Sequence, residues 1–321
     1  MANVSVGYVR RLEVKRQMRA GDIAAVSELL DLAAAADGHR PLDEHKWIDL
    51  VHGGRRGFAG LIAWEEGHDH PVGFAQLTRG DGNWAVEYVV DPHHREGEGP
   101  EIATDLLSWA IDMVGSEGGG HLHLWVPKPT EVHDRVAAAA GLSRGRDLLQ
   151  MRRPLPLGEA EAGGRPPLAV RPFAVGRDEE AWLEVNNRAF SRHPEQGGWD
   201  VATLKERQAE SWFDPAGFLL HERHGRLAGF CWTKVHDDHQ PPLGEIYVVA
   251  VDPDFADQGL GRALVVAGLD HLAALGLATA MLYVDSGNEA ALRLYRRLGF
   301  DVDHVDRAYT GDVAPTTGGL G

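Results

Sequence analysis

The length, composition and charge of the chain limit what it can be. It has 321 residues and a formal net charge of −16, so it is long enough for two ordinary domains, and it is ill suited to nucleic acid, whose phosphates are bound through Lys and Arg. A cationic amine substrate fits this charge better, and Cys231, the only cysteine, excludes an intrachain disulfide.

The N-terminal segment shows no targeting signal. Basic and acidic residues are mixed from Arg10 to Arg16 without an apolar stretch, and no run of about 18 apolar residues occurs in the sequence. We therefore expect a cytoplasmic protein with no membrane partner.

The first half contains a strand signal followed by a glycine loop. Residues 88–92, Tyr-Val-Val-Asp-Pro, end in a turn signal, and residues 94–99, His-Arg-Glu-Gly-Glu-Gly, carry two carboxylates. Near the middle of the chain, residues 154–167 are rich in Pro, Gly and Glu and lack apolar periodicity, as a linker does. We expect an N-terminal domain at 1–152, a linker at 153–168 and a C-terminal domain at 169–321.

The most informative segment of the second half is a strand followed by a glycine loop and a helix. Residues 244–253 are rich in β-branched residues and end in Asp-Pro, and Gly-Leu-Gly-Arg follows at 259–262. The helix is predicted from an apolar stripe that ends at Gly276 and consists of Leu260, Leu264, Ala267, Leu272 and Leu275. The first N–H groups of a helix lack intrahelical partners and lie at the positive end of its dipole, so they can hold phosphate oxygens. We interpret this corner as a pyrophosphate site, with glycines that serve only a tight turn as the alternative.

A second strand and a second helix follow. Residues 280–285 predict a strand, and Ser286 to Glu289 has the form of a capping box. Leu292, Tyr295 and Leu298 share one face of a helix that stops at Gly299 and Phe300.

The two halves align on their shared Asp-Pro, which indicates an internal repeat. The matching segments are 88–92 with 249–253, 122–126 with 281–284, and 139–142 with 297–300. In this alignment Trp84 stands where the second half has Glu245, and Ala137 where it has Tyr295. Only the second half therefore carries both polar groups.

The order of elements in the second half resembles the GCN5-related N-acetyltransferase (GNAT) superfamily. That order is strand, glycine loop, helix, strand, Asn-capped helix and Leu-Gly-Phe. The resemblance implies an α/β fold with a mixed sheet, and the repeat implies two GNAT domains in tandem. In this superfamily the first loop holds the pyrophosphate of acetyl-CoA, and the second helix lies beside the pantetheine and the thiol. We expect acetyl-CoA as the acyl donor, with catalysis in the C-terminal domain only.

Amide formation from a thioester needs a base for the amine, a donor for the oxyanion and a proton for the thiolate. Glu245 is the candidate base, directly or through water, with a solvated strand-end carboxylate as the alternative. Tyr295 is the acid that the superfamily implies, although its helix face also fits a core tyrosine. The superfamily further implies a backbone N–H near Val249 as the oxyanion donor.

Further segments resemble the mycothiol synthase family within this superfamily, namely 193–199, 212–215, 232–236, 244–249 and 282–286. That family acetylates the cysteinyl amine of cysteinyl-glucosaminyl-inositol, which implies a small pseudo-disaccharide thiol as the substrate. The implied substrate contacts are Glu44, Glu195, Lys234, Glu245 and Tyr283. The implied acetyl-CoA contacts are Val249, Ala250, Val251, Ala256, Asp257, Gln258, Gly259, Leu260, Gly261, Arg262, Asn288, Glu289, Ala290, Ala291, Leu292 and Arg293, together with Tyr88, Val89 and Val90 in the first half.

Several alternatives stay open. The short acidic loop at 94–99 argues against acetyl-CoA in the first half, and Glu44, Glu195 and Lys234 each fit an ordinary surface position. A metal would need more ligands than the sequence 236–239 or the pair at 121 and 123 provides, so we expect none. Other functional hypotheses are acetylation of a protein N-terminus or an aminoglycoside, and acyl-CoA sensing without turnover. We expect a monomer.

Overall fold

The computed structural model describes most of the chain as two compact units. The described residues are 10–38, 41–42, 44–52, 57–80, 83–158, 161, 166–191, 198–237 and 239–316, and at 44, 45, 48 and 52 the description covers the backbone only. The first unit comprises Met1–Asp147 and Val305–Gly321, and the second comprises Leu148–His304. No helix in the described ranges is long and apolar enough to cross a membrane.

In its described residues, the first unit contains six neighbouring strands of a mixed sheet. Its order is β1-β2-β3-β4-β5-β12, with β4 and β5 parallel and all other neighbours antiparallel. The strands are β1 (Arg10–Lys15), β2 (Ala59–Glu65), β3 (Gly73–Arg79), β4 (Asn83–Val90), β5 (Gly120–Pro127) and β12 (Asp301–Val313).

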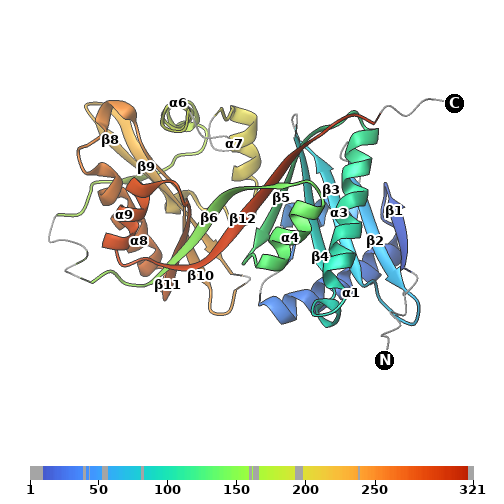
Figure 1. The fold of residues 1–321 in the computed structure, drawn as a ribbon. Coiled ribbons are helices and arrows are strands. Elements are labelled where there is room, and N and C mark those ends of the chain that lie inside the picture. Colours follow the sequence, from blue (N-terminus) through green and yellow to red (C-terminus); the bar gives the residue numbers. More distant parts are fainter. Residues whose placement is uncertain are drawn as a thin grey trace. The chain divides into compact units, whose positions relative to one another are not determined.

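Helices cover both faces of this sheet, as Figure 1 shows. The helices are α1 (Ala20–Asp37), α2 (Glu44–His52), η1 (Pro92–His94), α3 (Gly99–Ser116) and α4 (Glu131–Ala139). Side chains alternate between the faces along a strand, so Leu61 of β2 packs with α3 while Ile62 packs with α1.

The second unit repeats this plan. Its sheet order is β6-β11-β10-β9-β8-β7, with β10 and β11 as the parallel pair. The strands are β6 (Ser143–Pro154), β7 (Arg171–Pro172), β8 (Phe218–Arg223), β9 (Arg226–His236), β10 (Leu243–Val251) and β11 (Thr279–Asp285). The helices are α6 (Glu179–Ala189), α7 (Val201–Gln208), η2 (Pro215–Gly217), η3 (Pro253–Phe255), α8 (Leu260–Ala274) and α9 (Glu289–Arg297).

The two faces of this second sheet have different cores. One core joins α8 and α9 to the sheet through side chains such as Leu264, Leu292 and Ile246. The other is aromatic and contains Trp182 of α6 and Trp232 of β9. The predicted strands at 244–253 and 280–285 and the two predicted helices are therefore confirmed.

Two local predictions about these helices are wrong. Leu275, placed in the apolar stripe of α8, is 51% exposed because it follows the last helical residue. Ser286 does not begin a capping box, since Asn288 is the N-cap of α9 and its side chain accepts a hydrogen bond from the Ala291 N–H at 3.1 Å. A side chain must sit directly before the first helical turn to reach these N–H groups.

The unit boundaries also differ from the expected domain limits at 152 and 169. Strand β6 pairs with β11 from Leu148 to Pro154 inside the second unit. Strand β12 returns to the first unit, where Asp306–Val313 pairs with β5. Within the expected linker, Leu155 and Leu157 pack on the core of the second unit. The C-terminal segment belongs to the first unit because it supplies the strand that completes the hydrogen bonding of β5.

Candidate active site

The parallel strands of the second unit separate soon after they meet. Gly244 pairs with Ala280 and Glu245 with Met281, but β10 continues to Val251 and β11 to Asp285 without further pairing between them. Main-chain groups on these separated edges lack partners from the opposite strand, and buried N–H and C=O groups need partners. We call this opening the fork, and it can accept an extended ligand that carries amide groups.

A β-bulge lies in β10 directly after Glu245. The register against β9 shifts between Ile246 and Val248, so Tyr247 is the extra residue. Ile246 belongs to the core with α8, whereas Tyr247 and Val248 both contact the aromatic core on the other face. A bulge redirects side chains and increases local twist, and here it coincides with the start of the fork.

Glu245 is buried in a polar setting on the face away from α8. Its side chain is 8% exposed, and its Oε2 lies 2.7 Å from His236 Nε2, a hydrogen-bond distance. Lys234 is its direct cross-strand partner. This placement is not that of the solvated strand-end carboxylate that was the alternative.

An aromatic pair lies next to these polar groups. Lys234 Nζ is 4.5 Å from the ring centroid of Trp212 and 5.9 Å from that of Tyr247, distances at which a cation interacts with a ring face. Burial raises the pKa of Tyr247, and the nearby Glu245 carboxylate adds to this effect.

Tyr283 lies on the same face of the sheet as Glu245. Leu282 and Val284 belong to the core with α8, so the alternating Tyr283 points to the opposite face. It is 39% exposed, and its hydroxyl oxygen accepts a hydrogen bond from Gln150 Nε2 at 2.7 Å. Of the other predicted substrate contacts, Glu195 and the side chain of Glu44 lie outside the described residues.

Tyr295 belongs to the opposite face. It lies on α9 in the core with α8, 8% exposed, with its ring centroid 5.9 Å from that of Phe300. Burial raises the pKa of Tyr295 to about 12, and the Cys231 thiol makes a smaller contribution. In the described part of the chain its hydroxyl has no recorded hydrogen-bond partner. Glu245 and Tyr295 are thus on different faces of one sheet, with the fork in the strands between those faces.

The loop between β10 and α8 leaves the start of the helix uncapped. Asp257 and Gly259 both have left-handed backbone conformations, with φ of 60° and 75°, and no side chain caps the helix at Gly259. A Cβ added to Gly261 would meet only Val251, at 3.9 Å. The predicted contacts from Val249 to Val251, from Ala256 to Arg262 and from Asn288 to Arg293 lie at the end of β10, in this loop with the start of α8, and at the start of α9.

Ion pairs with arginines of α6 and β9 hold this loop. Arg188 contacts the carboxylates of Asp252 and Asp254 at 3.1 and 2.9 Å, and Arg226 contacts Asp254 at 2.9 Å. The Asp252 carboxylate also accepts a hydrogen bond from the Asp254 N–H at 2.9 Å. The loop is therefore shaped by its own acidic residues, and the N–H groups of the α8 terminus are left available.

The corresponding corner of the first unit is filled by side chains. Strands β4 and β5 also separate, after Val86, but Arg95 Nε donates to the Val90 carbonyl at 3.1 Å and its guanidinium pairs with Asp37 at 2.5 and 2.9 Å. At the start of α3, Pro100 removes one N–H. Of the predicted acetyl-CoA contacts in the first unit, Val89 and Val90 are buried and Tyr88 packs against the core.

The aligned positions of the first unit carry no acid or base. Trp84 is the second residue of β4 to pair with β5, as Glu245 is in β10 with β11. It is 1% exposed, and its Nε1 donates to the Gly119 carbonyl at 3.2 Å. Ala137, at the position of Tyr295, is also buried.

Sequence reasoning missed three residues of the polar face: His236 as a partner of Glu245, and Tyr247 and Trp212 as contacts of Lys234. Alternation along β9 is a signal for His236, because residues two apart on a strand share a face with Lys234. The bulge has no comparable signal, so the direction of Tyr247 requires the structure.

Comparisons with known proteins agree with this geometry. The model of the acetyltransferase (GNAT) family matches residues 180–300. A mycothiol acetyltransferase from Acidimicrobium ferrooxidans is 46% identical over 288 residues, which cover 88% of this chain and 92% of that protein. One from Streptomyces avermitilis is 43% identical over 307 residues, covering 94% and 96%.

Solved structures show the same fold over both units. A GCN5-related N-acetyltransferase from Sphaerobacter thermophilus superposes with a TM-score of 0.70 at 21% identity, covering 95% of this chain and 96% of that one. A tandem GNAT protein from the clavulanic acid biosynthesis pathway also gives 0.70, at 18% identity and with coverage of 95% and 100%. The chain is thus a tandem GNAT protein with a mixed α/β fold, and it belongs to the mycothiol acetyltransferase family.

Proposed function

We propose that the chain transfers the acetyl group of acetyl-CoA to the cysteinyl amine of cysteinyl-glucosaminyl-inositol, which completes mycothiol. The observation that carries the proposal is the 46% identity to a mycothiol acetyltransferase over 88% of the chain. A cytoplasmic location, a monomeric state and the lack of nucleic-acid or membrane partners stay predictions.

The second unit fits acetyl-CoA as the acyl donor. The uncapped N-terminus of α8 offers N–H groups and positive dipole potential to a pyrophosphate, and backbone can approach closely at Gly261. The separated edge of β10 would satisfy the amide groups of the pantetheine arm. These features support binding through main-chain groups.

The polar face of the fork would receive the amine. We assign Glu245 as the base that takes a proton from the ammonium, directly or through water, and His236 as the group that orients the carboxylate. Lys234 and Tyr283 offer polar contacts for sugar and inositol hydroxyls. Glu195 and Glu44 remain proposed substrate contacts from the family resemblance.

The two faces of the sheet would contribute to different steps of the reaction. The neutral amine nitrogen attacks the thioester carbonyl carbon from the Glu245 face, and the developing oxyanion is stabilised by a main-chain N–H near Val249. The nitrogen of the tetrahedral intermediate gives up its extra proton to water as the C–S bond breaks on the Tyr295 face. The phenol protonates the leaving thiolate and regains a proton from water. A pKa near 12 keeps this phenol protonated at neutral pH. The location of Glu245 and Tyr295 on opposite faces is consistent with an acyl group that reaches through the fork.

We further propose that the first unit has no catalytic role and does not use acetyl-CoA as a donor. In the first unit Arg95 occupies the Val90 carbonyl at the separated edge of β4, and Trp84 and Ala137 stand in place of the base and the acid.

The test is an assay of free CoA release with acetyl-CoA and purified cysteinyl-glucosaminyl-inositol. We expect amine-dependent release and a product heavier by one acetyl group. A protein N-terminal peptide and an aminoglycoside offered in competition should not reduce product formation. If either competitor is acetylated in preference, it is the substrate in place of cysteinyl-glucosaminyl-inositol. If the protein binds acetyl-CoA but releases no free CoA with any amine, it is an acyl-CoA sensor.

A further inference from the structure

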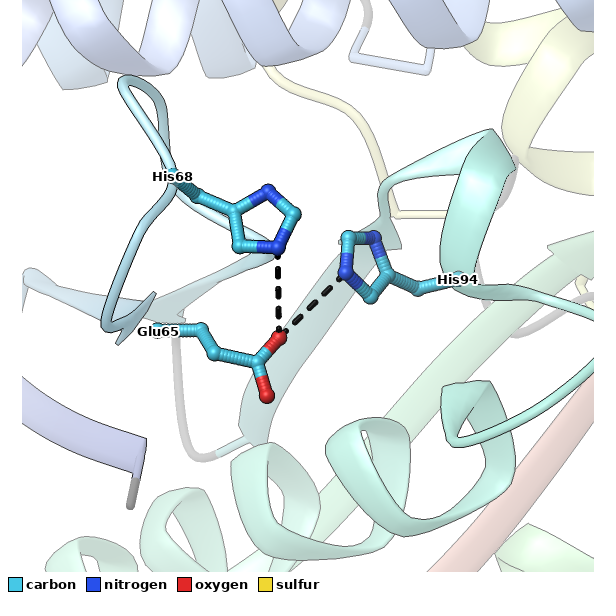
Figure 2. A group of neighbouring side chains, drawn as sticks. All are labelled: Glu65, His68 and His94. Atoms are coloured by element: carbon cyan, nitrogen blue, oxygen red, sulfur yellow. Dashed lines mark ion pairs between the residues drawn. The ribbon is translucent and has the colours of Figure 1, made fainter. Parts of the chain in front are cut away.

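Two histidines and a buried glutamate meet in the first unit. Glu65 ends β2, His68 lies in the turn between β2 and β3, and His94 ends η1 after β4. Figure 2 shows the rings of His68 and His94 directed toward the Glu65 carboxylate. Glu65 Oε2 is 3.7 Å from His68 Nε2 and 3.3 Å from His94 Nε2.

These distances have the spacing of ligands around a tetrahedral ion. One ligand atom from each residue lies within 4.8 Å of the other two. With metal bonds of about 2.0–2.1 Å, two ligands of a tetrahedral zinc ion are roughly 3.3–3.4 Å apart. The separations of 3.7 and 3.3 Å from Glu65 Oε2 to the two histidine nitrogens lie within a few tenths of an ångström of this spacing. Imidazole with carboxylate is a donor set that suits Zn²⁺, whereas Mg²⁺ prefers oxygen ligands.

Two buried atoms of the cluster have no hydrogen-bond partner among the described residues. They are Oε1 of Glu65 and Nδ1 of His94, and the Glu65 side chain is only 3% exposed. A carboxylate buried this deeply is costly unless its oxygens have partners. The separation of 3.7 Å to His68 is an ion-pair distance, too long for a hydrogen bond. A cation between the three residues would balance this buried carboxylate through Oε2, the oxygen that both rings face.

A second carboxylate stands behind one of the ligands. Asp91 Oδ2 is 3.4 Å from His94 Nδ1, the nitrogen that faces away from Glu65. Metal-binding histidines usually donate their other N–H to such a carboxylate. Nδ1 makes no hydrogen bond to a described residue, and a small rotation of the His94 ring toward Asp91 would form it. Asp91 is itself held by His70 and His93 at 2.7 and 3.0 Å.

We propose that the first unit binds one Zn²⁺ ion through Glu65, His68 and His94, with water as the fourth ligand. His68 is 36% exposed, so the ion has a route from solvent. The ion would connect the β2–β3 turn to the segment after β4, the counterpart of the loop that we assign to acetyl-CoA in the second unit. The site is structural and independent of acetyl transfer.

The test is a Zn²⁺ titration of the full-length, metal-stripped protein by calorimetry. We expect a stoichiometry of one, no response to Mg²⁺, and Co²⁺ spectra of a four-coordinate site. His68→Gln and His94→Gln should each weaken Zn²⁺ binding by at least about 100-fold, and Asp91→Asn by roughly 10–100-fold. Zn²⁺ should raise the Tm of the wild type and leave that of the ligand variants unchanged.

The matched control is His121→Gln. His121 and His123 form another close histidine pair, with ring centroids 4.6 Å apart, but they belong to no three-ligand group in the described residues. This variant should bind Zn²⁺ as the wild type does. The proposal would be overturned if the wild type does not bind Zn²⁺ stoichiometrically, or if His94→Gln and His121→Gln lose Zn²⁺ affinity equally. Melting curves of the metal-free proteins check that each variant folds.

Discussion

Glu245 combines burial with a small set of polar neighbours. A carboxylate kept from water needs hydrogen bonds to remain ionised at low cost, and His236 provides one at 2.7 Å. Lys234 lies opposite on β9, held over the ring of Trp212. The arrangement fixes the direction of the carboxylate before a substrate arrives, which is the condition for general-base catalysis.

Glu245→Gln should lower kcat by roughly 10²–10⁴-fold, because the amide cannot accept the proton. The Kd for acetyl-CoA should change little, since the proposed phosphate contacts lie in the α8 loop. Steady-state kinetics and equilibrium binding of acetyl-CoA measure both. The matched control is Glu87→Gln on β4, the corresponding strand of the first unit, which should keep its kcat. Normal turnover in Glu245→Gln would remove the assignment.

Tyr295→Phe tests whether the hydroxyl serves chemistry or only packing. Because the hydroxyl has no hydrogen-bond partner among the described residues, its removal should leave the Tm nearly unchanged. The kcat should nevertheless fall, by about 10-fold or more, if the phenol protonates the thiolate. A core role predicts the reverse, an unchanged kcat with altered stability. Thermal melts and kinetics on one preparation separate the two.

Sequence reasoning reached Glu245 and Tyr295 through position in a motif, but their environments required the structure. The hydrogen bond to His236 follows from strand alternation, which a sequence shows once the strand is assigned. Glu245 and Tyr295 lie on opposite faces because Tyr295 of α9 packs on the same face as Ile246, and Glu245 alternates with Ile246 along β10. Nothing in the local composition marks Tyr247 as the extra residue of the bulge in β10.

Two glycines of helix α8 have different surroundings. Gly261 has open space where a side chain would begin, whereas Gly268 faces Cys231 Sγ at 2.5 Å and Ile246 Cδ1 at 2.7 Å from an added Cβ. The first glycine is therefore not required by packing, and a ligand is the remaining physical reason for it. The second permits the close approach of α8 to the sheet.

Gly261→Ala should raise KM for acetyl-CoA roughly tenfold, equivalent to about 1.4 kcal/mol, because the methyl group obstructs phosphate. Its stability should be equal to or greater than that of the wild type, by up to roughly 1 kcal/mol, since alanine favours a helix. Gly268→Ala is the control, and overpacking should destabilise it by about 1–3 kcal/mol. Denaturant unfolding and acetyl-CoA kinetics are compared. An unchanged KM in Gly261→Ala would exclude a close phosphate contact.

At the scale of elements, strong periodic patterns predicted the structure well and the ends of elements less so. The helix with Leu292, Tyr295 and Leu298 on one face is present, and those three side chains are buried. Errors occurred at Leu275 and Ser286, where the helix ends one residue earlier or begins two residues later than the pattern indicated. Several neighbouring residues at these positions could cap a helix. The end of the helix is therefore known only from the hydrogen bonds in the structure.

The pairing of β12 with a strand of the first unit was not predictable from local sequence patterns. β12 follows the strands of the second unit in the sequence, yet its residues Asp306–Val313 pair with β5 of the first unit. Periodicity indicates a strand but not its partner, and this partner is nearly two hundred residues away in the sequence. The repeat led us to expect self-contained halves, whereas the first unit depends on the end of the chain.

Tyr309→Ala should destabilise the first unit, although residue 309 lies at the end of the sequence. Its side chain is 1% exposed in the core of that unit, and its hydroxyl donates to Asp134 Oδ1 at 2.8 Å. Loss of a buried aromatic side chain costs about 3–5 kcal/mol. Amide hydrogen exchange should show faster exchange along β5, while β10 of the second unit keeps its protection.

Val302→Ala is the control for this prediction, because Val302 lies on the same strand but is 43% exposed and belongs to the second unit. It should leave exchange in β5 unchanged, since surface substitutions rarely alter stability by more than about 0.5 kcal/mol. If Tyr309→Ala instead lowered protection of β5 and β10 equally, the two units would unfold as one cooperative body. Selective loss in β5 means that the end of the chain stabilises the N-terminal sheet, so a truncation at residue 304 would impair the first unit before the catalytic one.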